Sequence, residues 1–114
     1  MTRRNKYNAV KTKQDGYTFD SKAEAARYGE LVILQAAGEI ERLEVHPCFI
    51  LQDSFTDATG TRQRAISYEG DFMYWQGDTH YVEDVKGVET AVFKLKRKLF
   101  LARYPDLVLL VVKR

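Results

Sequence analysis

A two-residue loop, Gly77-Asp78, separates two segments that have the character of short strands, Ser67–Trp75 and Thr79–Lys86. A glycine in the first loop position suits a type II′ turn, whose twist matches the twist of the flanking strands. The loop therefore predicts a β-hairpin in which Gln76 stands opposite Thr79. Because the turn sets the register of a hairpin, this one pair determines which residues face each other along both strands.

The predicted register places Asp71 opposite Asp84 and Glu69 opposite Lys86. Directly opposed side chains on one face lie about 4.5–5.5 Å apart at Cβ, where two like charges destabilise the sheet. Two carboxylates that close together indicate a cation between them. Asp84 and Lys86 alternate with Val85 on one strand and therefore project from the same face. The pattern predicts two acids and a lysine on one sheet surface, which is the chemistry of a metal-dependent phosphodiesterase.

Composition limits the class of protein. With 114 residues, 45% of them hydrophobic and 30% charged, the chain is expected to form one soluble globular domain with a modest core. A formal net charge of +2 is too small by itself to indicate a nucleic-acid partner. The one cysteine, Cys48, allows no internal disulfide and is interpreted as a small buried apolar residue. No apolar run approaches the roughly 20 residues of a membrane span and no signal peptide opens the chain, so we expect a cytoplasmic protein that does not associate with membranes.

Basic residues gather at the start of the chain, where the first thirteen residues contain five of them and no acid. Such a segment predicts a mobile arm that lies along a phosphate backbone, with Arg3, Arg4 and Lys6 as DNA contacts. A solvated terminus without a role is an equally good interpretation. We place the flexible arm at residues 1–18 and a single folded domain at residues 19–114.

Helix and strand signals follow one another along the rest of the chain. A first helix is expected from Asp20 or Ser21 to about Ala37, with Gly38 as its C-terminal cap, and its apolar residues predict that it is largely buried. The remaining elements are expected as strands at Ile40–Val45, at Cys48–Asp53 and from about Arg64, the hairpin at Gly77, a second helix at Thr90–Arg103 and a buried final strand at Leu107–Val112. The order helix, about three strands, helix, strand predicts an α/β sandwich with a mixed sheet.

Asp71 is followed along the chain by Asp84-Val85-Lys86, and Glu24 lies on the first expected helix within Ser21-Lys-Ala-Glu24. This pattern, an acid and then Asp/Glu-x-Lys with a further acid on a preceding helix, resembles the PD-(D/E)XK nuclease superfamily. The resemblance covers roughly Phe19 to Pro105 and looks more specifically like small phage-encoded members, with similar arrangements in archaeal-type Holliday-junction resolvases and transposon-end endonucleases. One departure is that Gly70, and not a proline, precedes Asp71.

The resemblance implies a restriction-endonuclease-like αβββαβ core, with a mixed sheet flanked by helices. It also implies a Mg²⁺-dependent endodeoxyribonuclease whose products carry 5′-phosphate and 3′-hydroxyl ends, with Mn²⁺ able to replace Mg²⁺ and no small-molecule organic cofactor. Glu24, Asp71 and Asp84 are the implied metal ligands. They share the implied catalytic role with Lys86, which helps to position or deprotonate the attacking water.

Glu24 admits two interpretations. Ser21-x-x-Glu24 is also a capping box, which requires no function. Against that, Glu24 lies on the same helix stripe as Tyr28 and Leu31, and an acid that points inward needs a partner. We favour the role of metal ligand and keep capping as the alternative.

The other acids and the histidines near the motifs are interpreted as follows. Glu69 either holds the lysine opposite it or serves as an outer ligand. Glu83 falls on the opposite strand face from its neighbour Asp84 and is interpreted as solvated or facing a partner. His46 and His80 are interpreted as structural or surface residues, because oxygen ligands already satisfy a magnesium site.

The second expected helix carries a cluster of basic residues. At about 100° per residue, its apolar residues gather on one side with Lys96 in their middle, while Lys94, Arg97 and Lys98 point away. We favour Lys96 as a second catalytic basic group that reaches the site or the bound phosphate, over a stem that snorkels to solvent. The outward residues predict DNA-binding contacts to phosphates, with an ordinary solvated helix face as the alternative.

The predicted substrate is branched DNA such as a Holliday junction, cut by a structure-selective endonuclease during phage recombination or packaging in the host cytoplasm. A symmetric junction requires two cuts, so this hypothesis predicts a homodimer with two-fold symmetry. A nicking or weakly specific nuclease, or the cutting subunit of a larger complex, is an alternative of the same class. A catalytically inactive nucleic-acid-binding module is an alternative of another class, which the opposed acids do not favour.

Overall fold

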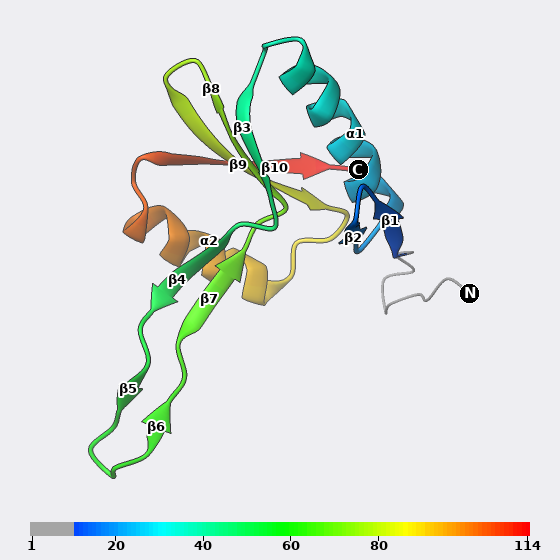
Figure 1. Cartoon of the computed structure of the whole chain (residues 1–114). Helices are drawn as coiled ribbons and strands as arrows, with labels where there is room; N and C mark the ends of the chain where they lie inside the picture. The colour runs from blue at the N-terminus through cyan, green and yellow to red at the C-terminus, as the bar shows by residue number, and fades with distance from the viewer. Residues whose placement is uncertain (1–10) are drawn as a thin grey trace.

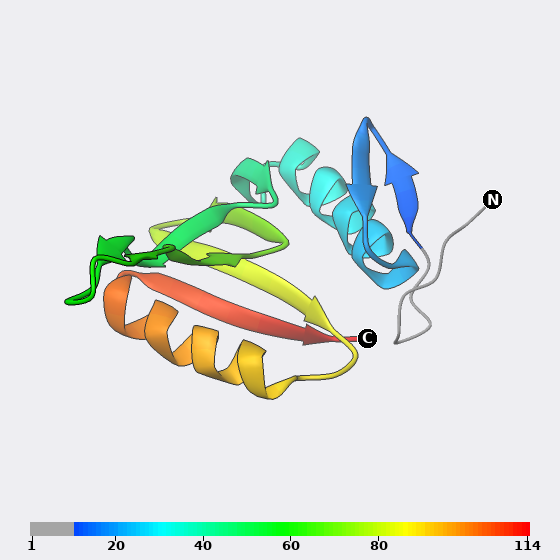
Figure 2. The same cartoon turned by 90° about the horizontal axis from the view of Figure 1, so that it is seen from below.

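The computed structural model of the protein describes residues 11–114. Within them, a four-stranded mixed sheet lies between two helices, with α1 over one face and α2 over the other (Figures 1 and 2). The strands run in the order β10-β9-β8-β3, with β10 parallel to β9 and the other neighbours antiparallel. The bounds of these elements are α1 Lys22–Ala36, β3 Glu41–Val45, β8 Phe72–Gln76, β9 Thr79–Lys86, α2 Ala91–Arg103 and β10 Leu107–Lys113. The predicted α/β class with a mixed sheet and two helices is confirmed.

The β8–β9 hairpin has the register that its turn predicts. Gln76 pairs with Thr79, and the ladder continues to Phe72 opposite Glu83. Gly77 has a φ of +59°, as the first position of a type II′ turn requires. The prediction of one unbroken strand before the turn is wrong, because the chain leaves the sheet at residues 70 and 71.

The residues before this break belong to a second, long hairpin, residues 48–69, which projects away from the sheet (Figure 1). Its base pairs Glu69 with Cys48, so Glu69 does not stand opposite Lys86, and the predicted pair is wrong. Cys48 is exposed and not buried as expected. The strands of the long hairpin are β4 Cys48–Gln52, β5 Phe55–Thr56, β6 Arg62–Gln63 and β7 Ile66–Glu69.

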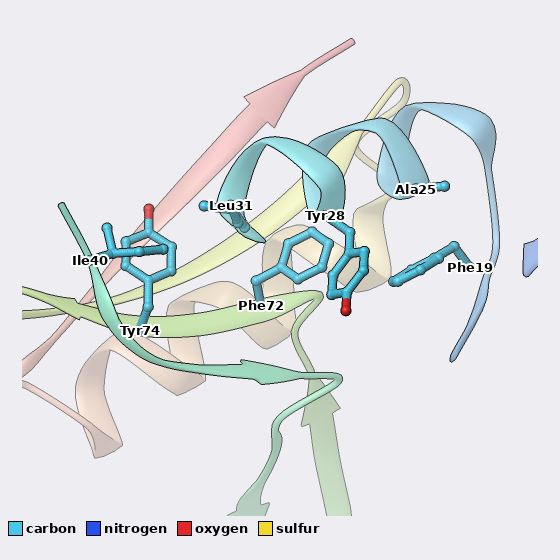
Figure 3. Packing of buried hydrophobic residues seen from close by; sticks show 7 residues of the cluster. All are labelled: Phe19, Ala25, Tyr28, Leu31, Ile40, Phe72 and Tyr74. Carbon is cyan, nitrogen blue, oxygen red and sulfur yellow. The ribbon is translucent and has the colours of Figure 1, made fainter. Parts of the chain in front are cut away.

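Two apolar clusters fill the space between the sheet and the helices. The sheet supplies both, because Phe72 and Tyr74 face α1 whereas Met73 between them packs on the α2 side. Figure 3 shows the first cluster, under α1, formed by Phe19, Ala25, Tyr28, Leu31, Ile40, Phe72 and Tyr74. The second lies under α2 and is formed by Phe49, Leu51, Tyr68, Val82, Phe93 and Phe100.

Both helices begin at the predicted residues. Ser21 Oγ accepts from the Glu24 amide at 3.1 Å at the start of α1, and Thr90 Oγ1 accepts from the Phe93 amide at 3.1 Å at the start of α2. The predicted burial of α1 is only half right, because Leu31 is fully buried whereas Ile33 is 69% exposed. Neither helix of the described residues has the length and apolarity that a membrane span needs.

The predicted inward side of α2 is only partly right. Of the apolar residues expected there, Phe93 and Phe100 are buried and contact the base of the long hairpin, whereas Val92, Leu95 and Leu99 are exposed. Phe100 and Phe49 pack edge to face with ring centroids 4.9 Å apart. Two phenylalanines of α2 therefore face the core, and its aliphatic residues face outward.

A short hairpin precedes α1 and is formed by β1 (Thr12–Gln14) and β2 (Tyr17–Phe19). The Tyr28 hydroxyl of α1 donates to Asp15 Oδ2 at 2.9 Å. The folded part therefore begins before residue 19, within the segment predicted as a flexible arm. The predicted DNA contacts Arg3, Arg4 and Lys6 lie outside the described residues.

Gly70 occupies the break between β7 and β8, where no side chain fits. A Cβ at this position would lie 2.8 Å from Val82 Cγ1, and the Gly70 amide donates to the Pro47 carbonyl at 2.9 Å. A proline would bring the same Cβ and would lack the donor. Glycine at this position thus has a steric cause.

We expect Gly70→Ala to lower the free energy of unfolding by about 1–3 kcal/mol, the usual cost of overpacking a core. Gly29→Ala is the matched control, because Gly29 lies inside α1 and the nearest atom to a new Cβ is 3.8 Å away. This control should raise the free energy of unfolding by about 0.5–1 kcal/mol, since alanine is the better helix former. Urea titrations of the three proteins measure both values, and a Gly70→Ala variant as stable as the parent would contradict the packing.

Candidate active site

Four of the five predicted catalytic residues line one cavity of about 390 Å³. They come from separate elements that meet there: Glu24 from the first turn of α1, Asp71 from the break before β8, and Asp84 and Lys86 from the end of β9. The remaining wall is formed by Asp20, Ser21, Ala23, Val85, Gly87, Val88, Thr90 and Arg114. The three sequence motifs thus converge on one hollow at the edge of the sheet.

Asp71 and Asp84 meet because the hairpin register continues past the end of β8. The Asp71 amide donates to the Glu83 carbonyl at 2.9 Å, and its Oδ2 accepts from the Val85 amide at 2.6 Å. Asp84 is 2% exposed, with its Oδ1 3.3 Å from Lys86 Nζ and its Oδ2 bonded by the Tyr68 hydroxyl. Both carboxylates are therefore held in place by hydrogen bonds from the chain itself.

Glu24 takes part in the cap of α1 and also lines the cavity. Its amide donates to Ser21 Oγ as in a cap, and its carboxylate oxygen Oε2 accepts from the Asp20 amide at 3.3 Å. The same side chain is almost fully buried in the cavity wall. Its other oxygen, Oε1, lies 2.9 Å from His46 Nε2.

The contact of His46 with the site was missed by sequence reasoning. His46 follows β3 in a left-handed conformation with a φ of +55°, and its amide donates to the Asp71 carbonyl at 2.9 Å. The ring packs on Phe19 with centroids 5.7 Å apart. His46 thereby touches both Glu24 and the backbone of Asp71. No local signal in the sequence indicates this contact. His80, in contrast, stacks on Trp75 at 4.2 Å between centroids, as expected of a structural residue.

The cavity holds more negative charge than nearby cations neutralise. Burial, followed by the charges of Glu24 and Asp84, raises the pKa of Asp71 from 3.8 to about 9. Burial also raises the pKa of Glu24, although the contact with His46 opposes this shift. The pKa of the Tyr68 hydroxyl is raised by burial and by Asp84, which keeps it a hydrogen-bond donor. A bound cation would relieve this repulsion.

The donor set fits a hard divalent ion such as Mg²⁺, which takes carboxylate oxygens and retained waters. In residues 11–114, no three His, Cys, Asp or Glu side chains already stand in the arrangement that holds a metal ion. Two of the acids are instead turned to partners, Glu24 to His46 and Asp84 to Lys86. A metal would therefore take carboxylates that exchange these contacts for the ion.

The expectation that Glu83 is solvated or faces a partner is wrong. It is fully buried under α1, where the Arg27 guanidinium donates to both of its oxygens at 2.8 Å and the Tyr74 hydroxyl donates to Oε2. Arg27 lies one helical turn after Glu24, and Glu83 precedes Asp84 on β9. The buried pair therefore ties the element that carries one site acid to the element that carries another.

Lys96 does not line the cavity with the three carboxylates. It borders a second hollow of about 290 Å³ together with Lys86 and Phe93. The other basic residues of α2 differ in exposure. Lys94 and Lys98 are exposed, as predicted. The prediction of an outward Arg97 is wrong, because its guanidinium is half-buried over the Phe93 ring and 2.8 Å from Glu89 Oε1.

A family model described as "Protein of unknown function (DUF1064)" matches residues 4–114, almost the whole chain. No curated protein and no solved structure gives a significant match to the chain. Roles for individual residues therefore follow from the geometry of the cavity and its charges.

Arg27→Ala should lower the free energy of unfolding by about 3–5 kcal/mol, because it leaves the buried Glu83 carboxylate without its counter-charge. Adding Glu83→Gln should recover part of this loss by removing the buried charge. Asp53→Ala is the control, since Asp53 is 79% exposed in its ion pair with Arg103 and should cost less than about 1 kcal/mol. Denaturant titration measures all of these, and equal effects of Arg27→Ala and Asp53→Ala would contradict a structural role of the buried pair.

The raised pKa of Asp71 predicts how stability without metal depends on pH. The folded protein binds the Asp71 proton more tightly than the unfolded chain, so the stability from this group is present at low pH and is lost as pH rises from about 4 toward 9. Asp71→Asn should flatten this slope and, near pH 9 with a chelator, be more stable by at least about 1 kcal/mol, the value of one pKa unit. Urea unfolding across this pH range tests it, with Asp78→Asn in the exposed turn as control. An unchanged slope would show that Asp71 ionises normally.

Proposed function

We propose that this chain, which belongs to the DUF1064 family of proteins of unknown function, is a Mg²⁺-dependent DNA endonuclease that hydrolyses phosphodiester bonds. The observation that carries the proposal is the convergence of Glu24, Asp71, Asp84 and Lys86 on one cavity. Two buried acids, Glu24 and Asp84, and the half-buried Asp71 have a deficit of counter-charge, which suits an ion that also binds phosphate. One lysine beside them suits the developing negative charge of phosphoryl transfer.

The order of elements supports a place for the chain in the PD-(D/E)XK superfamily. The helices and the strands of the main sheet follow one another as α1-β3-β8-β9-α2-β10, the αβββαβ order that the superfamily implies. The acids of the sequence pattern sit where that core would carry them: on the first helix, before the second strand and at the end of the third. We propose a restriction-endonuclease-like core on this basis.

Each residue of the cavity has a distinct task in the proposed reaction. Glu24, Asp71 and Asp84 would hold one or two Mg²⁺ ions, which activate a water and neutralise charge on the scissile phosphate. The Val85 amide and the Tyr68 hydroxyl hold the carboxylates of Asp71 and Asp84 in orientation. His46 holds the Glu24 carboxylate through Oε1, and a bound ion would take this oxygen in its place.

Lys86 supplies a positive charge beside the carboxylates. Its ammonium lies 3.3 Å from Asp84 Oδ1 and 4.6 Å from the centroid of the Phe93 ring, which restricts its position. Released from Asp84, it would donate to a non-bridging phosphate oxygen or to the attacking water. Such a point charge acts most strongly where negative charge grows, in the transition state.

For the substrate, we propose branched DNA cut by a homodimer, since two symmetric cuts on a junction require two copies of the cavity. Labelled four-way junction, duplex and single-stranded DNA, each incubated with Mg²⁺ or with a chelator, test the proposal. Preferential Mg²⁺-dependent cutting of the junction supports it, and equal cutting of all three favours a weakly specific nuclease. Binding without cutting of any DNA would refute the enzyme and leave a binding module.

Asp71→Asn should abolish Mg²⁺-dependent cleavage while the protein stays folded. Lys86→Ala should lower turnover by about a hundredfold or more, as expected for the loss of one group that stabilises the transition state, and should leave DNA binding in Ca²⁺ nearly unchanged. Lys94→Ala, an exposed lysine on α2, is the matched control. Single-turnover cleavage and filter binding measure the two quantities. Wild-type rates in Asp71→Asn would show that the cavity is not the active site, and equal loss of binding in the two lysine variants would reduce Lys86 to a DNA contact.

A further inference from the structure

We propose that the second hollow, between the long hairpin and α2, binds a phosphate that neighbours the scissile phosphate on the same DNA strand, and that Lys96 is its cation. The inference rests on the proposed nuclease function. It adds a binding site outside the catalytic cavity and assigns Lys96 to that site.

The two hollows adjoin each other. Lys86 and Thr90 line both of them, so a DNA strand whose phosphate enters the carboxylate cavity passes next to the second hollow. The second hollow measures about 290 Å³. Its lining consists of Tyr68, Glu69, Lys86, Thr90, Val92, Phe93 and Lys96.

The hollows differ in charge. The first is lined by four carboxylates and by Lys86 and Arg114, whereas the second places Lys86 and Lys96 against one acid, Glu69, which is exposed. Of the described residues, none forms an ion pair or hydrogen bond with Lys96. Its neighbour Arg97 is paired, because the Arg97 guanidinium lies 2.8 Å from Glu89 Oε1. Lys96 is therefore the cation of this region that is available to a ligand.

The other polar groups of the second hollow favour an anion as its ligand. Thr90 Oγ1 already accepts from the Phe93 amide, so its hydroxyl proton remains to be donated. The Tyr68 hydroxyl is committed to Asp84. Lys86, Lys96 and Thr90 offer more donors than the one acid of the hollow, Glu69, accepts from, which suits phosphate oxygens. The apolar faces of Val92 and Phe93 suit the sugar that joins two phosphates.

The spacing of phosphates makes the neighbour the natural occupant. Each strand of DNA carries one phosphate per about 3.4 Å of helix axis, so a scissile phosphate at the carboxylates brings the next one to the adjoining hollow. Lys86 stands at the junction of the two hollows, bound to Asp84 on one side and over the Phe93 ring on the other. In this arrangement Lys96 contacts a phosphate that does not react. Its contribution to the cleavage rate depends on the negative charge of that phosphate.

The test uses the full-length protein and a four-way junction whose cut position has been mapped. The phosphate immediately 5′ or 3′ of the cut is replaced by a neutral methylphosphonate, and single-turnover rates are measured at subsaturating protein. We expect the cleavage rate of the wild type to fall about tenfold when the phosphate at one of the two positions is neutral. This is the equivalent of one charge-assisted contact of about 1.4 kcal/mol. Lys96→Ala should cut unmodified DNA about tenfold more slowly than the wild type. The methylphosphonate at the sensitive position should not lower the rate of this variant further.

Matched variants separate this contact from general electrostatics. Lys94→Ala and Lys98→Ala remove exposed charges of the same helix and should keep the wild-type sensitivity to the methylphosphonate. Lys96→Arg should restore much of the rate on unmodified DNA. The proposal is overturned if Lys96→Ala stays as sensitive as the wild type at both positions, or if all three alanine variants behave alike.

A second measurement distinguishes failure of the site from failure of the proposed function. If the wild type cuts no DNA, the nuclease proposal falls, and the hollow is tested by binding alone. The side-chain ammonium signals of Lys86 and Lys96 are then followed by NMR during titration with a short thymidine oligonucleotide in Ca²⁺. Larger shifts at these two lysines than at the exposed Lys94 and Lys98 support the phosphate site, and equal shifts or none overturn it.

Discussion

The register of β8 against β9 decides which acid of β9 enters the cavity. Phe72 pairs with Glu83 and the Asp71 amide donates to the Glu83 carbonyl, so Asp84 comes to lie beside Asp71. Because successive residues of a strand face opposite sides of the sheet, a slip by one residue would exchange Glu83 and Asp84. The cavity would then receive the acid that now pairs with α1, and the core would receive the other. Gly77, held at a φ of +59°, prevents that slip by admitting the turn that fits the ladder.

Glu83 and Asp84 are adjacent and both buried, yet the fold treats them differently. Glu83 accepts from two nitrogens of Arg27 and from Tyr74, which neutralises its charge. Asp84 has one lysine and one hydroxyl and shares its cavity with three further carboxylates. A buried acid with a full set of partners serves the structure, whereas the charges of Glu24 and Asp84 add to burial in raising the pKa of Asp71, which lowers stability without a ligand. The contrast within one dipeptide separates an acid that the structure neutralises from one that belongs to the proposed site.

Local signals were sufficient for much of the fold and for the core of the candidate site. Ser21 and Thr90 begin the two helices as predicted, because a cap acts within a single turn. The turn at Gly77 placed Asp71 beside Asp84, since the period of a strand carries a register along its length. The inward side of α2 was predicted only in part for a different reason. Its apolar residues spread over more than one side, and packing against the long hairpin buries only Phe93 and Phe100 among them.

The sequence by itself determined the order of helices and strands and the meeting of two site acids, because turns, caps and strand alternation act between near neighbours. Only the tertiary structure decided which charge meets which acid. Glu24 and His46 are 22 residues apart, and Arg27 and Glu83 are 56 residues apart. Such pairs form when a helix packs on a sheet, and packing depends on the shapes of whole layers. For the same reason, Lys96, predicted to reach the carboxylates or the bound phosphate, lies in the hollow beside them, where none of residues 11–114 forms an ion pair or hydrogen bond with it.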